Sequence, residues 1–172
     1  MGGDLSDLQL ESCRKDPGLA AITFAKLDLR ALPSEARYDF VTANAIRYGF
    51  DDAGFRDCIS SISGALKTGG TWLHLTSFTR GIRKSPSSRE PRHFPMAIPS
   101  HFRSFRTSRK LLQSNGFGTI EFRKFLIPVD LPMQDLGAAA IQTHTVTTTS
   151  GERLQFRGAL AQPWCHLVAT KG

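Results

Sequence analysis

The sequence is poor in cysteine and has no long apolar run. Its three cysteines, Cys13, Cys58 and Cys165, lie far apart and show no C-x-x-C spacing, which argues against a disulfide framework and against a zinc knot. We expect buried thiols in a reducing cytoplasm. No stretch approaches the roughly 18 apolar residues of a membrane span. The N-terminus has no basic region followed by an apolar run, so we expect no signal peptide.

Acidic side chains are scarce in one segment, residues 80–110. The segment contains nine basic residues and a single acid, Glu90, so its own charge is +8. The whole chain has a net charge of +7, and the residues outside the segment therefore sum to −1. Three interpretations stay open: a solvated lid with scattered arginines, an anionic small substrate bound by bidentate arginine contacts, and RNA or DNA binding. Because the rest of the chain is not basic, we expect no basic face over the whole domain. We therefore rank a nucleic-acid partner below a small-molecule substrate.

The first half of the chain alternates strand and helix patterns. We predict a helix capped by Ser6, a short strand over 20–28, and a strand over 38–44 that is buried on both faces. The next helix is predicted from its apolar spacing, and Gly69–Gly70 should end it before a strand over 71–78. Its apolar face consists of Phe55, Ile59, Ile62 and Leu66.

The second half is less regular and ends in strands. Residues 79–106 are rich in Arg, Ser and Pro, and we interpret them as a basic lid or insertion. A helix closed by Asn115–Gly116 and a strand over 119–129 should follow. A β-hairpin insertion at about 142–158 should turn at Ser150–Gly151, and a last strand covers 163–171. We therefore predict one α/β domain over 1–172, with a Rossmann-like, mostly parallel sheet and an antiparallel C-terminal strand.

Polar side chains end three of the predicted strands. They are Asp4, Asp28 and Asn44. Ligands of parallel α/β sheets bind beyond the carboxyl ends of the strands. A carboxylate at such an end can accept two hydrogen bonds from a ribose diol, and a second one can bind an adenine amine. The three strand ends are therefore the candidate ligand site.

The order of these segments is more specific than any one of them. GGDLS is followed by LDLRALP, then by YDFVTAN, and then by a helix that ends in LKTGG before the strand TWLHL. This ordered set resembles the class I methyltransferases, which use S-adenosylmethionine. The resemblance extends from Gly2 to about Val129, and PWCHLVATK suits the family's antiparallel last strand. The family's first strand and glycine-rich loop would precede Asp4, so we expect a sheet that is incomplete at its N-terminal side.

The resemblance implies roles for particular residues. Asp4, with Leu5, would hold the ribose of S-adenosylmethionine, and Asp28 and Leu29 would frame its adenine. The methionine part would lie beside Asn44, Ala45 and Ile46. Substrate contacts are expected from Tyr48 and His101. The resemblance names no catalytic residue and requires no metal.

Three functions follow as expectations. The first is transfer of a methyl group from S-adenosylmethionine to a small molecule. The second is a truncated, catalytically inactive methyltransferase-like protein. The third is a nucleic-acid methyltransferase or binder that acts through residues 80–110. We expect no membrane partner and a cytoplasmic location, and the oligomeric state stays open.

Overall fold

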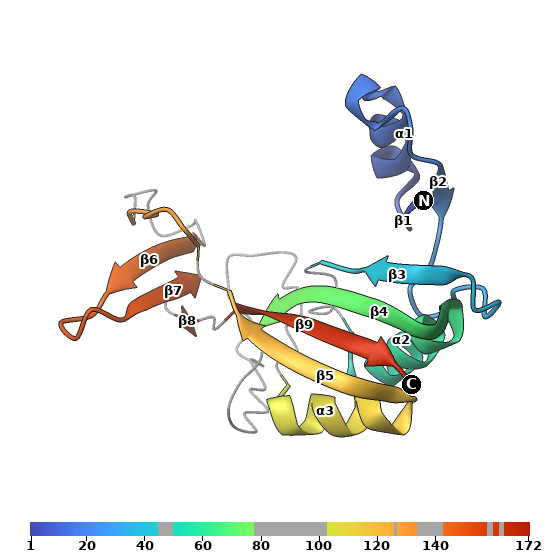
Figure 1. The fold of residues 1–172 in the computed structure, drawn as a ribbon. Helices are drawn as coiled ribbons and strands as arrows, with labels where there is room; N and C mark the ends of the chain where they lie inside the picture. The colour runs from blue at the N-terminus through green and yellow to red at the C-terminus, as the bar shows by residue number, and fades with distance from the viewer. Residues whose placement is uncertain (45–49, 78–102, 126, 134–142, 158–159, 162–163) are drawn as a thin grey trace.

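A four-stranded sheet carries the fold. The computed structural model describes residues 1–44, 50–77, 103–125, 127–133, 143–157, 160–161 and 164–172. In the sheet, β3 (Tyr38–Thr42), β4 (Leu66–Ser77), β9 (Trp164–Lys171) and β5 (Phe117–Lys124) lie side by side in that order (Figure 1). β3 pairs parallel with β4, whereas β9 runs antiparallel to both of its neighbours, β4 and β5. The predicted α/β fold, mostly parallel with an antiparallel C-terminal strand, is confirmed.

Two helices cover one face of this sheet. They are α2 (Asp52–Ala65), which lies behind β4 and β9 in Figure 1, and α3 (Phe105–Ser114), which lies below β5. The apolar stripe of α2 packs against every second residue of β9, as the pleat of a strand requires. The predicted helical face is confirmed as the core. The fully buried residues of this core include Phe55, Ile59 and Ile62 of α2, with Leu112 of α3 and Leu167 of β9.

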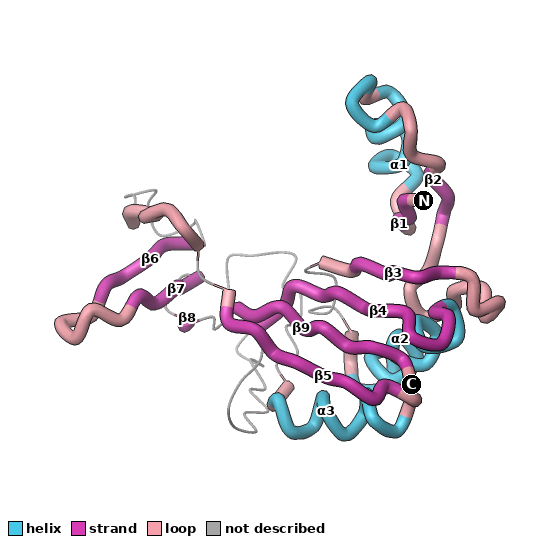
Figure 2. Tube along the Cα trace, in the orientation of Figure 1, coloured by secondary structure: helices cyan, strands magenta, loops and turns pink. Residues whose placement is uncertain are grey.

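The N-terminal residues form a separate, smaller unit. Here β1 (Gly2–Asp4) pairs parallel with β2 (Phe24–Lys26), and α1 (Asp7–Lys15) and the short 3-10 helix Pro17–Leu19 connect them (Figure 2). The predicted cap is present, because the Ser6 hydroxyl accepts from the Gln9 amide at 3.3 Å. The described residues of this two-stranded sheet make no strand pairing with the four-stranded one.

Four sequence predictions need correction. The strand expected over 119–129 is β5, which already ends at Lys124. The strand expected over 20–28 is shorter, because residues 17–21 form the 3-10 helix and a turn. The strand at 38–44 is not buried on both faces, since Phe40 is 73% exposed. Gly69–Gly70 do not cap α2. The helix already ends at Ala65, and both glycines lie inside β4, where Gly69 has a φ of 77°.

The predicted hairpin is confirmed. β6 (Thr143–Thr147) pairs antiparallel with β7 (Arg153–Arg157), and Gly151 supplies the positive φ of 80° at the turn. A two-residue strand, β8 (Leu160–Ala161), extends this sheet. The assignment of the hairpin as an insertion into one domain stays a prediction. The basic segment expected at 79–106 lies outside the described residues, except for residues 103–106.

The junction between α3 and β5 depends on one glycine. Gly116 has a φ of 85°, beyond the C-cap residue Asn115, as the sequence predicts. An alanine Cβ in this left-handed backbone costs about 1 kcal/mol. We expect Gly116→Ala to lower the free energy of unfolding by about that amount in urea denaturation. Gly118→Ala is the matched control, because its Cβ would meet nothing closer than 3.9 Å. Equal effects of the two variants would contradict this prediction.

Candidate functional site

A hollow lies where the N-terminal unit faces the edge of the four-stranded sheet. Its volume is about 320 Å³, at the lower end of the range of small-molecule sites. The carboxyl end of β1, the residues that follow β2, and all of β3 except Asp39 line it. We call it the β1–β3 hollow. Its lining includes Asp4, Leu5, Asp28, Leu29, Phe40, Ala43 and Phe50.

Four of the predicted site residues meet here. Asp4 and Leu5 end β1, and Asp28 and Leu29 follow β2, so the parallel pairing of these strands brings both acids to one edge. The other predicted positions do not join them. Asn44 is not among the lining residues, because its side-chain oxygen accepts from the Leu75 amide at 3.2 Å. Ala45, Ile46, Tyr48 and His101 lie outside the described residues.

Asp4 presents a carboxylate with spare acceptor capacity. Its Oδ1 accepts from the Ser6 amide at 2.8 Å, which holds the side chain at the start of α1. Its Oδ2 has no hydrogen-bond partner or ion pair among the residues that the structure describes. A carboxylate has about four acceptor sites. Asp4 therefore has the capacity to accept from hydroxyl groups that enter the hollow.

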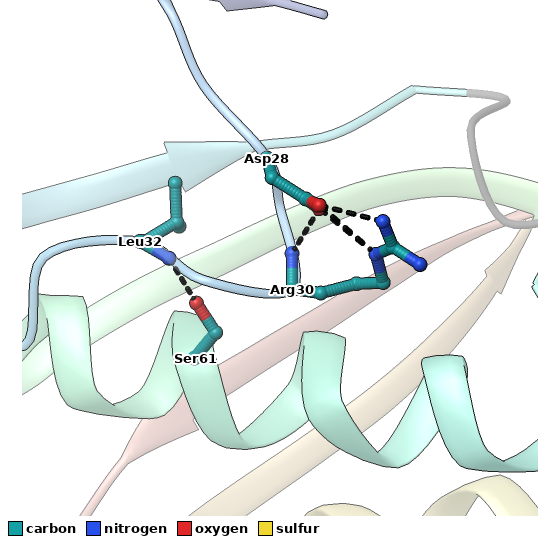
Figure 3. Close-up of polar contacts among 4 residues, drawn as sticks. All are labelled: Asp28, Arg30, Leu32 and Ser61. Carbon is teal, nitrogen blue, oxygen red and sulfur yellow. Dashed lines mark hydrogen bonds and ion pairs between the residues drawn. The ribbon is translucent and has the colours of Figure 1, made fainter.

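Asp28 is in a different state, because Arg30 already holds its carboxylate (Figure 3). Arg30 donates from Nη2 to Oδ2 at 2.6 Å, from Nε to Oδ1 at 3.0 Å, and from its backbone amide to Oδ1 at 2.9 Å. These hydrogen bonds from Arg30 hold the pKa of the Asp28 carboxyl below its usual value, so the group stays ionised. Little acceptor capacity remains on Asp28 while this pair is closed.

The loop after Asp28 is fixed to the helix layer. The Leu32 amide donates to the Ser61 hydroxyl of α2 at 2.6 Å (Figure 3). This contact joins the end of β2 to the scaffold of the large sheet. The wall of the β1–β3 hollow near Asp28 is therefore preorganised by α2 rather than by its own short strand.

Phe50 forms another part of the wall and is held from two sides. The guanidinium of Arg30 lies 5.8 Å from the centre of its ring, and Arg103 Nη2 donates to its carbonyl at 2.8 Å. Arg103 also bonds Asp52 through Nε at 3.1 Å, and its side chain is only 5% exposed. Burial lowers the pKa of this guanidinium, while Asp52 opposes the shift. One arginine of the basic segment is thus used inside the fold.

Sequence reasoning missed several lining residues. Phe40 and Thr42 line the β1–β3 hollow from β3, and Phe50 does so from the loop before α2. The period of two in YDFVTAN would have found the first pair, if the strand had been interpreted as open on one side. Phe50 carries no such signal, because its position depends on arginines distant in sequence. Among the described residues, no group of His, Cys, Asp and Glu side chains could hold a metal ion.

The pairing of Arg30 with Asp28 gives a pH prediction. In Arg30→Gln we expect the Asp28 pKa to rise toward its ordinary value of 3.8. NMR titration of the carboxyl carbon would measure this change. Because the native pKa is lowered, the pair stabilises the fold at neutral pH and this contribution is lost as the pH falls through the Asp28 pKa. Arg123→Gln is the control, since Arg123 pairs with Glu121 on β5. An unchanged Asp28 pKa in Arg30→Gln would refute the assignment.

Solved structures of other proteins share the fold of this protein over almost the whole chain. A SAM-dependent methyltransferase from Thermotoga maritima, described as a possible histamine N-methyltransferase, is 15% identical with a TM-score of 0.60, over 100% of this chain and 73% of that one. Human N-acetylserotonin methyltransferase in complex with SAM is 15% identical with a TM-score of 0.57, over 99% and 39%. The chain has the class I methyltransferase fold. The resemblance predicted from the sequence is confirmed at the level of this fold.

Other comparisons set the limits of that conclusion. A possible exported protein from Bordetella parapertussis is 18% identical with a TM-score of 0.61, over 99% of this chain and 52% of that one. This chain thus spans about half the length of that protein. No family model and no curated protein matches the sequence. In the part of the chain that the structure describes, no helix is both long and apolar enough to cross a membrane.

Proposed function

We propose that this protein transfers a methyl group from S-adenosylmethionine to a small-molecule acceptor. One observation carries the proposal: in a class I methyltransferase fold, the acid that ends β1 and the acid that follows β2 both line one hollow. The available Oδ2 of Asp4 and the apolar side chains of Leu5 and Leu29 fit a nucleoside, which needs an acceptor for its diol and a wall for its base.

The roles of the residues follow from their positions. Asp4 would accept from the two ribose hydroxyls, and Leu5 would pack beside the sugar. Leu29 would contact the adenine ring, while Asp28 would bind its amine after Arg30 has turned away. Asn44, Ala45 and Ile46 are proposed near the methionine part, and Tyr48 and His101 near the substrate. The bound cofactor supplies an activated sulfonium methyl, and the chain has to orient the acceptor and exclude water.

Two other functions are less well supported by the contacts. A nucleic-acid partner would need the arginines of the basic segment at the surface. Arg103 instead is buried and binds Asp52 and the Phe50 carbonyl. A catalytically inactive, methyltransferase-like binding protein is the alternative that a binding experiment tests directly.

Calorimetry with S-adenosylmethionine and S-adenosylhomocysteine tests the proposal. We expect saturable binding of both to the full chain, with a rise in the thermal unfolding midpoint at ligand concentrations above the dissociation constant. S-adenosylmethionine with a panel of small alcohols, phenols and amines then tests transfer. Unchanged unfolding midpoints and no heat of binding with either nucleoside would contradict the proposal and favour the inactive alternative.

A further inference from the structure

One arginine of the basic segment carries its charge inside the fold. The Arg103 side chain is 5% exposed, and its guanidinium lies over the Phe55 ring, with the central carbon 4.5 Å from the ring centre. Its Nε donates to Asp52 Oδ1 at 3.1 Å, and its Nη2 donates to the Phe50 carbonyl at 2.8 Å. Burying a guanidinium is unfavourable, so these contacts have to offset the loss of hydration.

These contacts satisfy only part of the guanidinium. Its Nη1 is buried and has no hydrogen-bond partner in the part of the chain that the structure describes. Asp52 is 71% exposed, so water solvates this carboxylate and the ion pair contributes little. A methionine side chain would fill the same place without a buried charge. The contact of Arg103 that an apolar side chain could not replace is the hydrogen bond to the Phe50 carbonyl.

That hydrogen bond reaches the wall of the β1–β3 hollow. Phe50 lines the hollow and lies two positions before the start of α2, outside any helix or strand. Its carbonyl accepts from no other donor among the described residues. Because secondary structure does not fix Phe50, a donor more than 50 positions away holds this part of the wall in place.

The Phe50 ring stands on the Asp28 side of the hollow. Arg30 holds the Asp28 carboxylate, and its guanidinium lies 5.8 Å from the centre of the Phe50 ring. Nucleobases stack on aromatic side chains, and the stacking tolerates any base. The ring is therefore next to the place where the proposed function puts the adenine.

We propose that Arg103 is a positioning residue for the nucleoside part of S-adenosylmethionine, which it orients through Phe50. This inference rests on the proposed function, because it needs a nucleoside in the β1–β3 hollow. Arg103 fixes the Phe50 backbone, so the ring keeps its place when Arg30 leaves Asp28 and the adenine takes the position of the guanidinium on the ring. Arg103 itself touches no ligand in this arrangement.

Arg103→Met separates positioning from stability. The methionine can still pack on Phe55, but it cannot donate to the Phe50 carbonyl. We expect adenosine and S-adenosylhomocysteine to bind about ten-fold more weakly in calorimetry. The urea midpoint should change little, because the variant also removes a buried charge. Unchanged binding of both nucleosides in folded Arg103→Met would overturn the proposal.

Arg109 provides the matched control. Its guanidinium lies 5.3 Å from the centre of the Phe122 ring, and its Nη1 donates to the Ile120 carbonyl at 2.8 Å. Arg109 thus makes the same two kinds of contact, but neither Phe122 nor Ile120, both within the described ranges, lines the β1–β3 hollow. Arg109→Met should bind nucleosides like the unchanged chain. Equal weakening in Arg109→Met and Arg103→Met would speak for a general effect of lost charge, against the proposal.

A second substitution tests whether Arg103 acts through Phe50. Phe50→Leu keeps the carbonyl and removes the ring, and we expect it to weaken adenosine binding about ten-fold. In that background Arg103→Met should have no further effect, because residues that act through one another are not additive. Losses that multiply in the double variant would contradict the proposal. If circular dichroism shows Arg103→Met to be unfolded, Arg103→Lys replaces it, since lysine keeps the charge but loses the planar fork.

Fluorine NMR distinguishes a failure of this inference from a failure of the proposed function. The chain is labelled with fluorophenylalanine, and the Phe50 signal is assigned from its loss in Phe50→Leu. Without ligand, we expect this signal to shift in Arg103→Met and to stay unchanged in Arg109→Met. A Phe50 signal that ignores Arg103→Met would refute positioning, even if nucleosides bind. A shifted signal in a protein whose unchanged chain binds no nucleoside would refute the proposed function and the role toward a nucleoside, and would leave only the contact between Arg103 and Phe50.

Discussion

We expect Asp4→Asn to weaken the proposed binding of S-adenosylhomocysteine by about ten-fold, and Asp4→Ala to weaken it by up to about 100-fold. These factors correspond to the roughly 1.5–3 kcal/mol that a hydrogen bond to a charged group contributes. Asparagine keeps the oxygen that accepts from the Ser6 amide, so this variant removes the charge and one acceptor without undoing the start of α1. Calorimetry with the full chain measures both effects.

Asp7 offers the matched control for Asp4. It is also an acid near the start of α1, but it pairs with Lys26 at 2.6 Å and does not line the β1–β3 hollow. Asp7→Asn should therefore bind the nucleoside like the unchanged chain. If Asp4→Asn and Asp7→Asn weaken binding equally, the ribose is not held by Asp4 and the general negative charge of this end explains the effect.

Replacing Phe55 with alanine lowers the free energy of unfolding by about 3–5 kcal/mol. The Phe55 ring is 0% exposed and lies in the cluster that α2 forms with the sheet. The variant opens a cavity there and removes the ring under the guanidinium of Arg103, whose central carbon lies 4.5 Å from the ring centre. Urea denaturation monitored by circular dichroism measures the loss. Such a loss is a large fraction of the roughly 5–15 kcal/mol by which a typical domain is stable.

Phe40 is the natural comparison for Phe55, because it is the same residue type with the opposite exposure. It is 73% exposed, so Phe40→Ala should change the free energy of unfolding by no more than about 0.5 kcal/mol. A loss in Phe40→Ala as large as that in Phe55→Ala would contradict the assignment of the core to the α2 side of the sheet.

The core could be predicted from the sequence because it depends on local periodicity. The spacing of four and three between Phe55, Ile59 and Ile62 defines one side of a helix, and all three residues are fully buried. The antiparallel last strand followed from the strands at the end of the chain, which no helix joins, and it agreed with the resemblance. Each of these predictions needs only neighbours along the chain, or a known order of segments.

The end of α2 could not be predicted in this way. The sequence favours Gly69–Gly70 as the cap, but the helix ends at Ala65, before either glycine. Near this end, the carbonyls of Ser63 and Leu66 accept from the Lys171 ammonium at 2.7 and 2.8 Å. A lysine more than 100 positions away thus takes part of the role of a glycine cap, and no local pattern contains that information.

The candidate site also has a part that could be predicted and a part that could not. The position of Asp4 and Asp28 at one hollow could be predicted, because the strand ends of a parallel sheet converge. The capture of Asp28 by Arg30 and of the Asn44 side chain by the Leu75 amide could not, since both depend on side-chain directions at the strand ends. In both cases a side-chain oxygen that the sequence would assign to a ligand already accepts a hydrogen bond from the protein itself.

The position of β9 between β4 and β5 has a consequence for how the protein folds. Thr71 of β4 meets Thr170 of β9 across 99 positions of sequence, and their hydroxyls lie 3.4 Å apart. Such distant pairing must close a long loop before it gains any contact energy, which slows folding. Until β9 arrives, β4 and β5 each expose an edge that can recruit another unfinished chain. Refolding yield should therefore fall steeply with protein concentration, and aggregation should originate at the centre of the sheet rather than at its rim.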